Sequence, residues 1–164
     1  YLDRHEQNVL ARLAEERRLE TEARRGRKIE PAGVRTSDED AQRGWSAAKA
    51  IDGSVQEPEG YWLTQSNSPK QAWLELSLAQ PARINRVSLF HQLDARHYRS
   101  RDYTVSVRSG GQWKPVVRVK DHKQSGWVGH PFDTVETDAV RLEITRSHYG
   151  SRMGVGEIEL RVEE

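Results

Sequence analysis

Short runs in which hydrophobic and polar residues alternate occupy most of the chain after residue 31. A period of two is typical of β-strands that bury one face. The apolar positions of the five clearest runs are Leu74, Leu76 and Leu78; Val87 and Leu89; Tyr103, Val105 and Val107; Val140, Leu142 and Ile144; and Ile158, Leu160 and Val162. Gln80-Pro81 separates the first two runs, and Gly110-Gly111 predicts a hairpin turn. The pattern predicts an all-β fold, a jelly-roll-like antiparallel β-sandwich.

The first 25 residues have a different pattern. They contain no glycine or proline and are rich in alanine, leucine, glutamate and arginine, which predicts one α-helix. Its apolar residues form a thin stripe, made of Leu2, Val9, Leu10, Leu13 and Leu19. The stripe could pack on the domain, on an upstream domain or on a second copy, or the helix could be a solvated connector. We therefore divide the chain into a helix or connector, residues 1–30, and a sandwich domain, residues 31–164.

Composition limits the classes of partner. The 164 residues suit one domain, and a net charge of +1 with mixed signs along the chain argues against nucleic acid. No stretch is apolar enough to suggest membrane insertion. The absence of cysteine excludes a disulfide framework and suits a bacterial protein. Because the chain begins at Tyr1 without a leader, we expect an excised piece of a larger protein, and we expect that protein to be secreted, periplasmic or at the cell surface.

Several motifs in a fixed order resemble one family. They are Lys49-Ala50-Ile51-Asp52-Gly53, Tyr61-Trp62, Pro69 to Leu76 with its Trp73-Leu74-Glu75-Leu76 core, Arg101-Asp102-Tyr103-Thr104-Val105, Gly111-Gln112-Trp113 and Gly156-Glu157-Ile158-Glu159. Their order through residues 32–164 is similar to that of the discoidin family, also called the coagulation factor 5/8 type C domain. That family has a galactose-binding-like fold, similar to family 32 carbohydrate-binding modules. The resemblance implies a binding domain and agrees with the predicted sandwich.

The resemblance also implies a structural calcium site, since a hard cation takes many oxygen ligands. Carried over to this sequence, Asp52 and Glu157 supply carboxylates, and Lys49, Ser54 and Gly156 supply backbone carbonyls. The loop from Ser54 to Gly60 is longer than the family's usual one, which leaves the middle ligands open. The alternative is that Asp52 merely caps a turn and Glu157 lies on a surface strand.

Three predicted loops combine an aromatic ring with cationic donors, as a sugar site requires. The candidate ligand-binding residues are His91, Arg96, Tyr98, Trp127, His148, Tyr149 and Arg152. Trp127, flanked by glycines, is the best candidate for an exposed ring, whereas Trp62 and Trp73 are expected in the core. Arg96 and Arg152 could instead bind a carboxylate or sulfate, because guanidinium is a planar fork.

Catalysis has no support in the sequence. There is no zinc-helix, nucleophile-elbow, phosphate-loop or dinucleotide motif, and the histidines lack metal-ligand spacing. We therefore expect a non-catalytic carbohydrate-binding module of a larger bacterial protein. Its glycan would be galactose-type or acidic, its site would lie in loops at one end of the sandwich, and it could accompany an enzyme and an upstream domain on the same chain. The alternative is a protein-docking or spacer domain.

Overall fold

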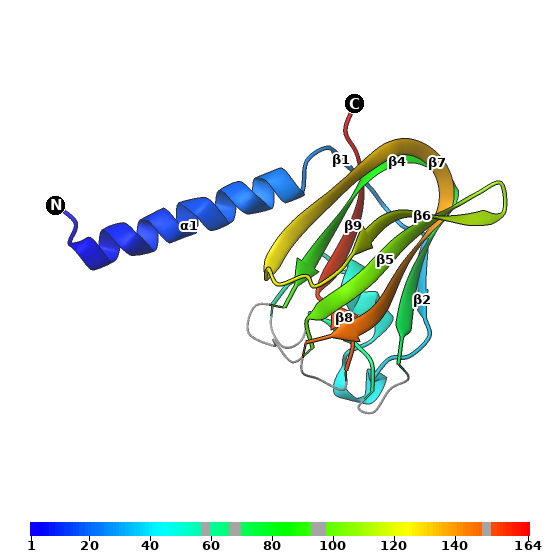
Figure 1. Cartoon of the computed structure of the whole chain (residues 1–164), viewed down its shortest axis with the longest axis horizontal. Helices are drawn as coiled ribbons and strands as arrows, with labels where there is room; N and C mark the ends of the chain where they lie inside the picture. Colours follow the sequence, from blue (N-terminus) through cyan, green and yellow to red (C-terminus); the bar gives the residue numbers. More distant parts are fainter. Residues whose placement is uncertain (57–59, 66–69, 93–97, 149–151) are drawn as a thin grey trace.

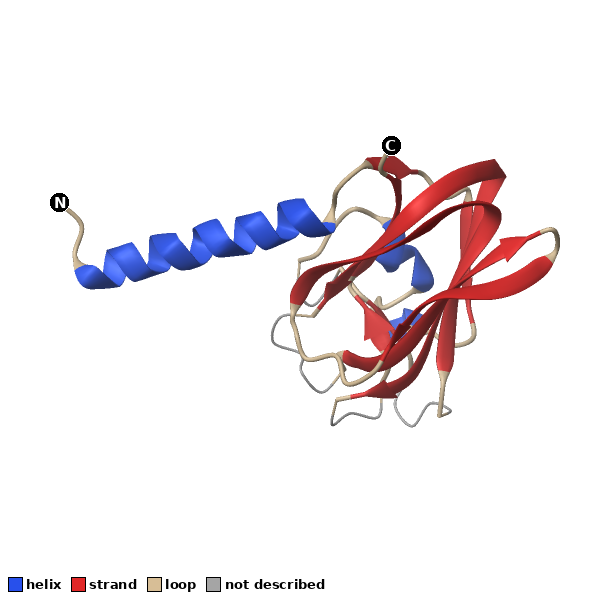
Figure 2. Ribbon diagram, turned by 45° about the horizontal axis from the view of Figure 1, so that its top comes forward, coloured by secondary structure: helices blue, strands red, loops and turns tan. Residues whose placement is uncertain are grey.

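The computed structural model describes residues 1–56, 60–65, 70–92, 98–148 and 152–164. A helix, α1 (Arg4–Ala23), precedes the strands β1 (Arg27–Ile29) and β2 (Gly33–Thr36) and two short 3-10 helices, η1 (Ala41–Arg43) and η2 (Ala47–Ile51). The remaining strands are β3 (Trp62–Leu63), β4 (Ala72–His91), β5 (Ser100–Ser109), β6 (Gln112–Val119), β7 (Gly126–Ser147), β8 (Gly154–Val155) and β9 (Glu157–Val162). The predicted all-β fold with one N-terminal helix is confirmed (Figures 1 and 2).

Two long strands, β4 and β7, run through both layers of the sandwich. They pair antiparallel from Ala72↔Ile144 to His91↔Gly126, with register shifts near the middle. The first part of β4 lies between β2 and β7, and β5 and β6 extend this layer. The last part of β4 lies between β7 and β9, and β1 pairs with the far edge of β9. β3 and β8 form a separate two-stranded sheet.

The two runs separated by Gln80-Pro81 therefore belong to one bent strand, β4. Residues 79–81 are exposed, and the register with β7 shifts between Ser77 and Ala82. Proline has no N–H to give to a strand ladder, so an irregular stretch is where a strand tolerates it. The break in the pattern thus marks the bend and not a loop. The predicted β5–β6 hairpin is confirmed, since Gly110 and Gly111 both have positive φ.

The core lies between the layers and contains the predicted apolar positions. Leu74, Leu76, Val87, Leu89, Tyr103, Val105, Val107, Val140, Leu142, Ile144, Ile158 and Leu160 form one buried cluster. Trp62 is also in this cluster, as expected. Trp73 is not: it lies half-buried on the outer side of β4, with the Arg141 and Arg35 guanidinium carbons 4.8 and 5.6 Å from its ring. Its neighbours Ala72 and Leu74 face the core, so alternation places Trp73 outside.

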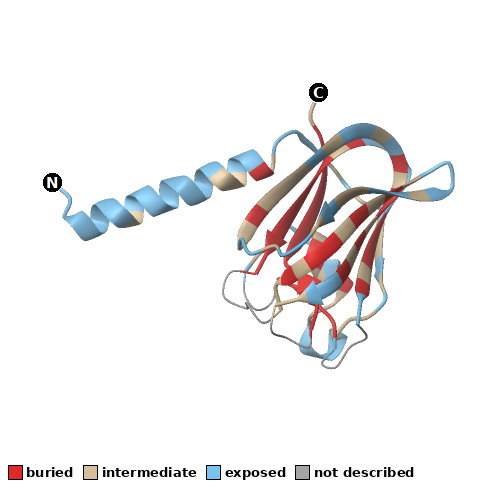
Figure 3. Cartoon of the chain, in the orientation of Figure 1, coloured by how far each residue is buried: buried red, intermediate tan, exposed pale blue. Residues whose placement is uncertain are grey.

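α1 projects from the sandwich and contacts it only near its C-terminal end (Figures 1 and 3). Asp3 caps the helix in a reciprocal pair with Glu6. Ala23 is its buried residue, and its carbonyl accepts a 2.6 Å hydrogen bond from the Ser88 hydroxyl. A Cβ on Gly129 would lie 2.6 Å from the Ala23 carbonyl oxygen, so glycine at this position permits the close approach. β1, inside the part assigned to the connector, adds a strand to the sheet directly after this contact.

Candidate functional site

The two carboxylates expected to hold calcium come together. η2 ends at Ile51, so Asp52 caps its C-terminus and Gly53 follows with φ 79°. The Gly53 N–H donates to Glu157 Oε2 at 2.7 Å, while Asp52 Oδ1 accepts from the Ser54 N–H at 2.9 Å. Glu157, the first residue of β9, is 1% exposed. The predicted meeting of loop and strand is therefore present.

The surroundings of Glu157 do not compensate the negative charge of its carboxylate. Burial, reinforced by the nearby Asp52 charge, raises the pKa of Glu157 to about 8, although the Gly53 N–H opposes the shift. Its Oε1 atom is buried and has no hydrogen-bond partner among the described residues. A divalent cation would satisfy this oxygen and compensate the two negative charges, so these residues fit calcium. The described residues contain no group of three His, Cys, Asp or Glu side chains suited to a metal, so backbone carbonyls of Lys49, Ser54 and Gly156 would have to complete the set.

Histidines gather at the end of the sandwich where β4 stops and β7 begins. His91 is 0% exposed, and its ring stacks on that of His122 with centroids 4.1 Å apart. The Tyr103 hydroxyl lies 3.3 Å from His91 Nε2 and 2.7 Å from His130 Nε2. His148 bonds the backbone carbonyl of His122. We call these four histidines and Tyr103 the histidine cluster.

Burial lowers the pKa of every histidine in the cluster for which a shift is resolved. The pKa of His130 falls to about 4, that of His91 falls well below its usual range, and that of His122 also falls. Neighbouring imidazoles and Arg99 add to the effect on His91, because each would repel a proton there. His91, His122 and His130 are therefore held in their neutral forms near pH 7.

Arg99 connects the loops at this end. Its Nε and Nη2 donate to the Gln92 carbonyl at 3.1 and 3.0 Å, and its Nη1 donates to the Lys123 carbonyl at 3.3 Å. Gln92 is fully buried, and neither of its side-chain amide atoms has a hydrogen-bond partner within the described ranges, which stop at this residue and resume at Tyr98. This end of the sandwich thus combines imidazoles, a guanidinium and an amide.

Trp127 is not the exposed loop residue that the sequence suggested. It is the second residue of β7, is 9% exposed, and meets Phe90 edge to face at 5.5 Å. The Arg24 guanidinium, from the end of α1, lies 4.3 Å from the centre of its ring. Glycines on both sides predicted a loop, but here they flank a tryptophan covered by the helix. Stacking of a sugar on this ring is therefore blocked on the face that Arg24 covers.

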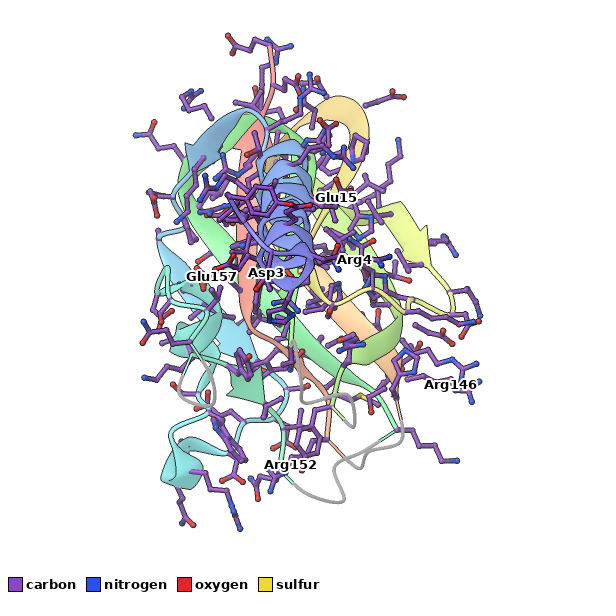
Figure 4. The ribbon with its side chains drawn as sticks, turned by 90° about the vertical axis from the view of Figure 1, so that its left-hand side faces the viewer. Asp3, Arg4, Glu15, Arg146, Arg152 and Glu157 are labelled. Carbon is purple, nitrogen blue, oxygen red and sulfur yellow. The ribbon has the colours of Figure 1, made fainter. Side chains whose placement is uncertain are left out.

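The Arg152 side chain is also bound to other groups within the protein. Its Nη1 donates at 2.8 Å both to Asp40 Oδ2 and to the Thr64 carbonyl, and its side chain is 7% exposed. The guanidinium lies 4.9 Å from the ring of Trp45. Figure 4 shows Arg152 well separated from Glu157 in that view. The expectation that Arg152 binds an acidic ligand is wrong in this structure, because its charge is already paired in a buried site.

The other candidates divide into two groups. Tyr98 and His148 are half-buried at the loop end, Tyr98 against the apolar cluster of Phe90 and Trp127. Arg96 and Tyr149 lie outside the described residues, and their proposed role stays a prediction. The sequence analysis missed His122, His130 and Tyr103. Alternation offered a signal for one member: Val87 and Leu89 face the core, so His91 two residues later faces it too.

The histidine cluster predicts a stability that depends on pH. Because the folded pKa of His130 lies near 4, below the usual 6.5, the unfolded chain binds the proton first as pH falls. Between pH 7 and 5 this residue should cost about 2 kcal/mol of unfolding free energy. Urea denaturation at both pH values should show that His130→Gln loses about 2 kcal/mol less than the unmodified chain. His5→Gln, on the exposed helix, is the control, and an equal loss in all three proteins would contradict the assignment.

Comparisons with known proteins agree with the fold. The sequence model described as the F5/8 type C domain matches residues 34–159. No curated protein matches the chain. Among solved structures, one similar fold is a Clostridium perfringens module, CpGH89CBM32-5, in complex with GalNAc-β-1,3-galactose, with a TM-score of 0.69, 17% identity and coverage of 78% of this chain and 93% of that one.

Two further structures have the same fold. The family 32 carbohydrate-binding module of Streptococcus pneumoniae EndoD has a TM-score of 0.70 at 14% identity and covers 84% of this chain and 100% of that one. A chitosan-binding module of a Paenibacillus chitosanase/glucanase has a TM-score of 0.63 at 22% identity, with 81% and 96% covered. No helix in the described part of the chain is long and apolar enough to cross a membrane.

Proposed function

The chain belongs to the F5/8 type C domain family, and from that premise we propose that it is a non-catalytic carbohydrate-binding module that takes a glycan at the loop end of its sandwich. The observation that carries the proposal is the gathering of the partly exposed His122, His148 and Arg99 where β4 ends and β7 begins. His91 and Gln92 lie beneath them and are fully buried, so they cannot contact a sugar directly. Imidazole and guanidinium groups offer donors and acceptors that suit sugar hydroxyls. Similar folds bind a GalNAc-galactose disaccharide or chitosan, which supports the ligand class.

The remaining expectations belong to the same proposal. The parent protein is bacterial, secreted, periplasmic or at the cell surface, and the module holds a linked upstream domain or enzyme near its substrate at raised effective concentration. The glycan is galactose-type or acidic. With Arg152 paired to Asp40, an acidic glycan would depend on Arg96 and on exposed cations such as Lys123.

A docking or spacer role is the second candidate. It is favoured by α1, which projects from the sandwich with exposed leucines along it. The two roles are separable, because the leucines lie on the helix and the polar cluster lies at one end of the sandwich.

Glycan binding should be measured on an array and confirmed by calorimetry. The array should include galactose-type sugars, chitosan oligomers and uronic or sulfated polymers, each with and without calcium. Arg96→Ala, Tyr149→Ala and His148→Ala should each weaken binding about 10-fold, the effect of losing one hydrogen bond to a charged or polar group. Arg118→Ala, exposed on β6 and away from the loop end, is the control. No binding to any glycan would overturn the proposal, and equal binding by all variants would overturn the site.

We also propose that calcium occupies the site made by Asp52 and Glu157 and fixes the loop after η2. The supporting observations are the unpartnered Glu157 Oε1 and the neighbouring Asp52 carboxylate. When bound, the ion would supply charge neutralisation. Lys49, Ser54 and Gly156 would contribute carbonyl oxygens, and the carboxylates would contribute the charge.

Calcium should therefore stabilise the fold. At a concentration 100-fold above its dissociation constant it should raise the melting temperature by about 5–10 °C relative to EDTA. Glu157→Gln should remove this shift, because the amide brings no charge to the cation. Glu136→Gln, exposed on β7, should keep it. Differential scanning calorimetry with and without calcium makes the comparison, and an equal shift in both variants would exclude Glu157 as a ligand.

A further inference from the structure

Large exposed hydrophobic side chains are confined to one segment of the described chain. They are Tyr1, Leu2, Leu10 and Leu13, and the three leucines are 45–52% exposed. Val9 between them is half-buried. Apolar groups concentrated on one surface mark an interaction site more reliably than the same number scattered over a domain.

The structure gives the free part of α1 little support. Ala23 in the last turn is its one buried residue, and Figure 4, which looks nearly along the helix, shows Asp3, Arg4 and Glu15 on the part that projects toward the viewer. The capping box and pairs such as Arg18 with Glu15 stabilise a helix only locally. In proteins most helical stability comes from tertiary packing of an apolar face, and the free part of α1 has little such packing in this structure. A partner on the exposed stripe would supply it.

Two hollows lie along the helix, one near each end. Near the free end, Leu2, His5, Glu6, Val9 and Leu10 line a shallow groove. At the docked end, a cavity of about 200 Å³ lies between the helix and the sandwich. Its walls are the apolar Leu19, Phe90 and Trp127, with Glu16, Glu20 and residues 124–126 around them.

The free stripe and the cavity lie on one side of the helix. Within α1, Val9, Leu13, Glu16 and Glu20 follow each other at intervals of four, three and four residues, which keeps them on one face, and Leu2 lies just before the helix begins. Glu16 and Glu20 line the cavity, so the leucine stripe continues along the same line toward the free end. One face thus carries protruding apolar side chains near the free end and a partly apolar cavity at the docked end. We call Leu2, Val9 and Leu13 the ridge.

We propose that α1 pairs with α1 of a second copy of this chain, antiparallel, in a two-fold symmetric dimer. Each ridge then lies on the other copy's helix, with Val9 opposite the partner's Leu13. In that register Leu2 is level with Leu19 and Glu20 of the other copy, and its side chain enters the cavity beside Trp127. The contact is self-complementary, as a two-fold interface must be.

The charges beside the ridge fit this arrangement. Glu6 and Arg17 lie on one flank of the ridge. In antiparallel helices like flanks meet, so Glu6 faces the partner's Arg17. A parallel pair would instead bring the partner's Glu16 and Glu20 to the cavity level and leave its apolar walls without an apolar occupant. Charge and shape therefore favour the same orientation.

The first test is the oligomeric state of the whole chain by sedimentation velocity over a wide concentration range. Leu13→Glu places a charge in the centre of the ridge and should weaken self-association at least 10-fold. Ala11→Glu adds the same charge two residues away, on the opposite side of the helix, and should change it less than 2-fold. Glu6→Arg and Arg17→Glu should each weaken association, and the double variant should recover it. Circular dichroism and glycan binding should stay unchanged, which separates this proposal from the function of the loop end.

Orientation can be tested by crosslinking, because the chain contains no cysteine. A mixture of Val9→Cys and Leu13→Cys chains should form the mixed disulfide on oxidation. Self-linked Val9→Cys and Leu13→Cys products in place of the mixed one would overturn the antiparallel arrangement. A chain that stays monomeric at every concentration, or that associates equally well as Leu13→Glu, would overturn the dimer and make an upstream segment the partner of the stripe.

Discussion

The pairing of β4 with β7 is the interaction on which the rest of the structure depends. These strands pair from Ala72↔Ile144 to His91↔Gly126, with register shifts at the bend, while both cross from one layer to the other. Because they belong to both layers, the bend fixes how the layers face each other and where the strands end. His91 and Gly126 are brought together at one end, and this juxtaposition positions the histidine cluster and the loops beside it. The polar groups proposed to bind a glycan are thus placed by backbone pairing.

A second constraint fixes the helix to the outer side of the layer that contains β9. Arg24 donates from Nε to Glu159 Oε1 at 2.8 Å, bonds Glu20 at 2.7 Å and covers Trp127. Glu159 is 2% exposed and also bonds Arg161, so the arginines hold the pKa of this buried carboxyl below its usual range against the opposing effect of burial. A buried charge needs such partners, and these connect the helix end to the sheet. The same contact hides the tryptophan that seemed most available for a ligand.

The sequence predicted the strands, the hairpin and the helix, because period and turn residues are local signals, whereas the meeting of Asp52 with Glu157 was expected from the family resemblance. It did not predict which polar residues are buried. β9 was expected to alternate, yet all six of its residues are buried, since Gly53 contacts Glu157, Arg24 pairs with Glu159, and Arg161 donates to the Gly26 carbonyl. Arg152 likewise appeared free because its partner Asp40 is 112 positions away. Ion pairs between distant segments leave no pattern in one sequence.

The central claim is that the sandwich binds its ligand at the loop end and not beside the helix. Amide chemical-shift mapping tests it most directly, with GalNAc-β-1,3-galactose and a chitosan oligomer as probes on the ¹⁵N-labelled chain. The account predicts that the shifted amides cluster at Gln92, Arg99, His122 and His148, while those of Leu19 and Trp127 stay in place. Shifts centred on Trp127 and the end of α1, or spread over the outer face of β5 and β6, would contradict it.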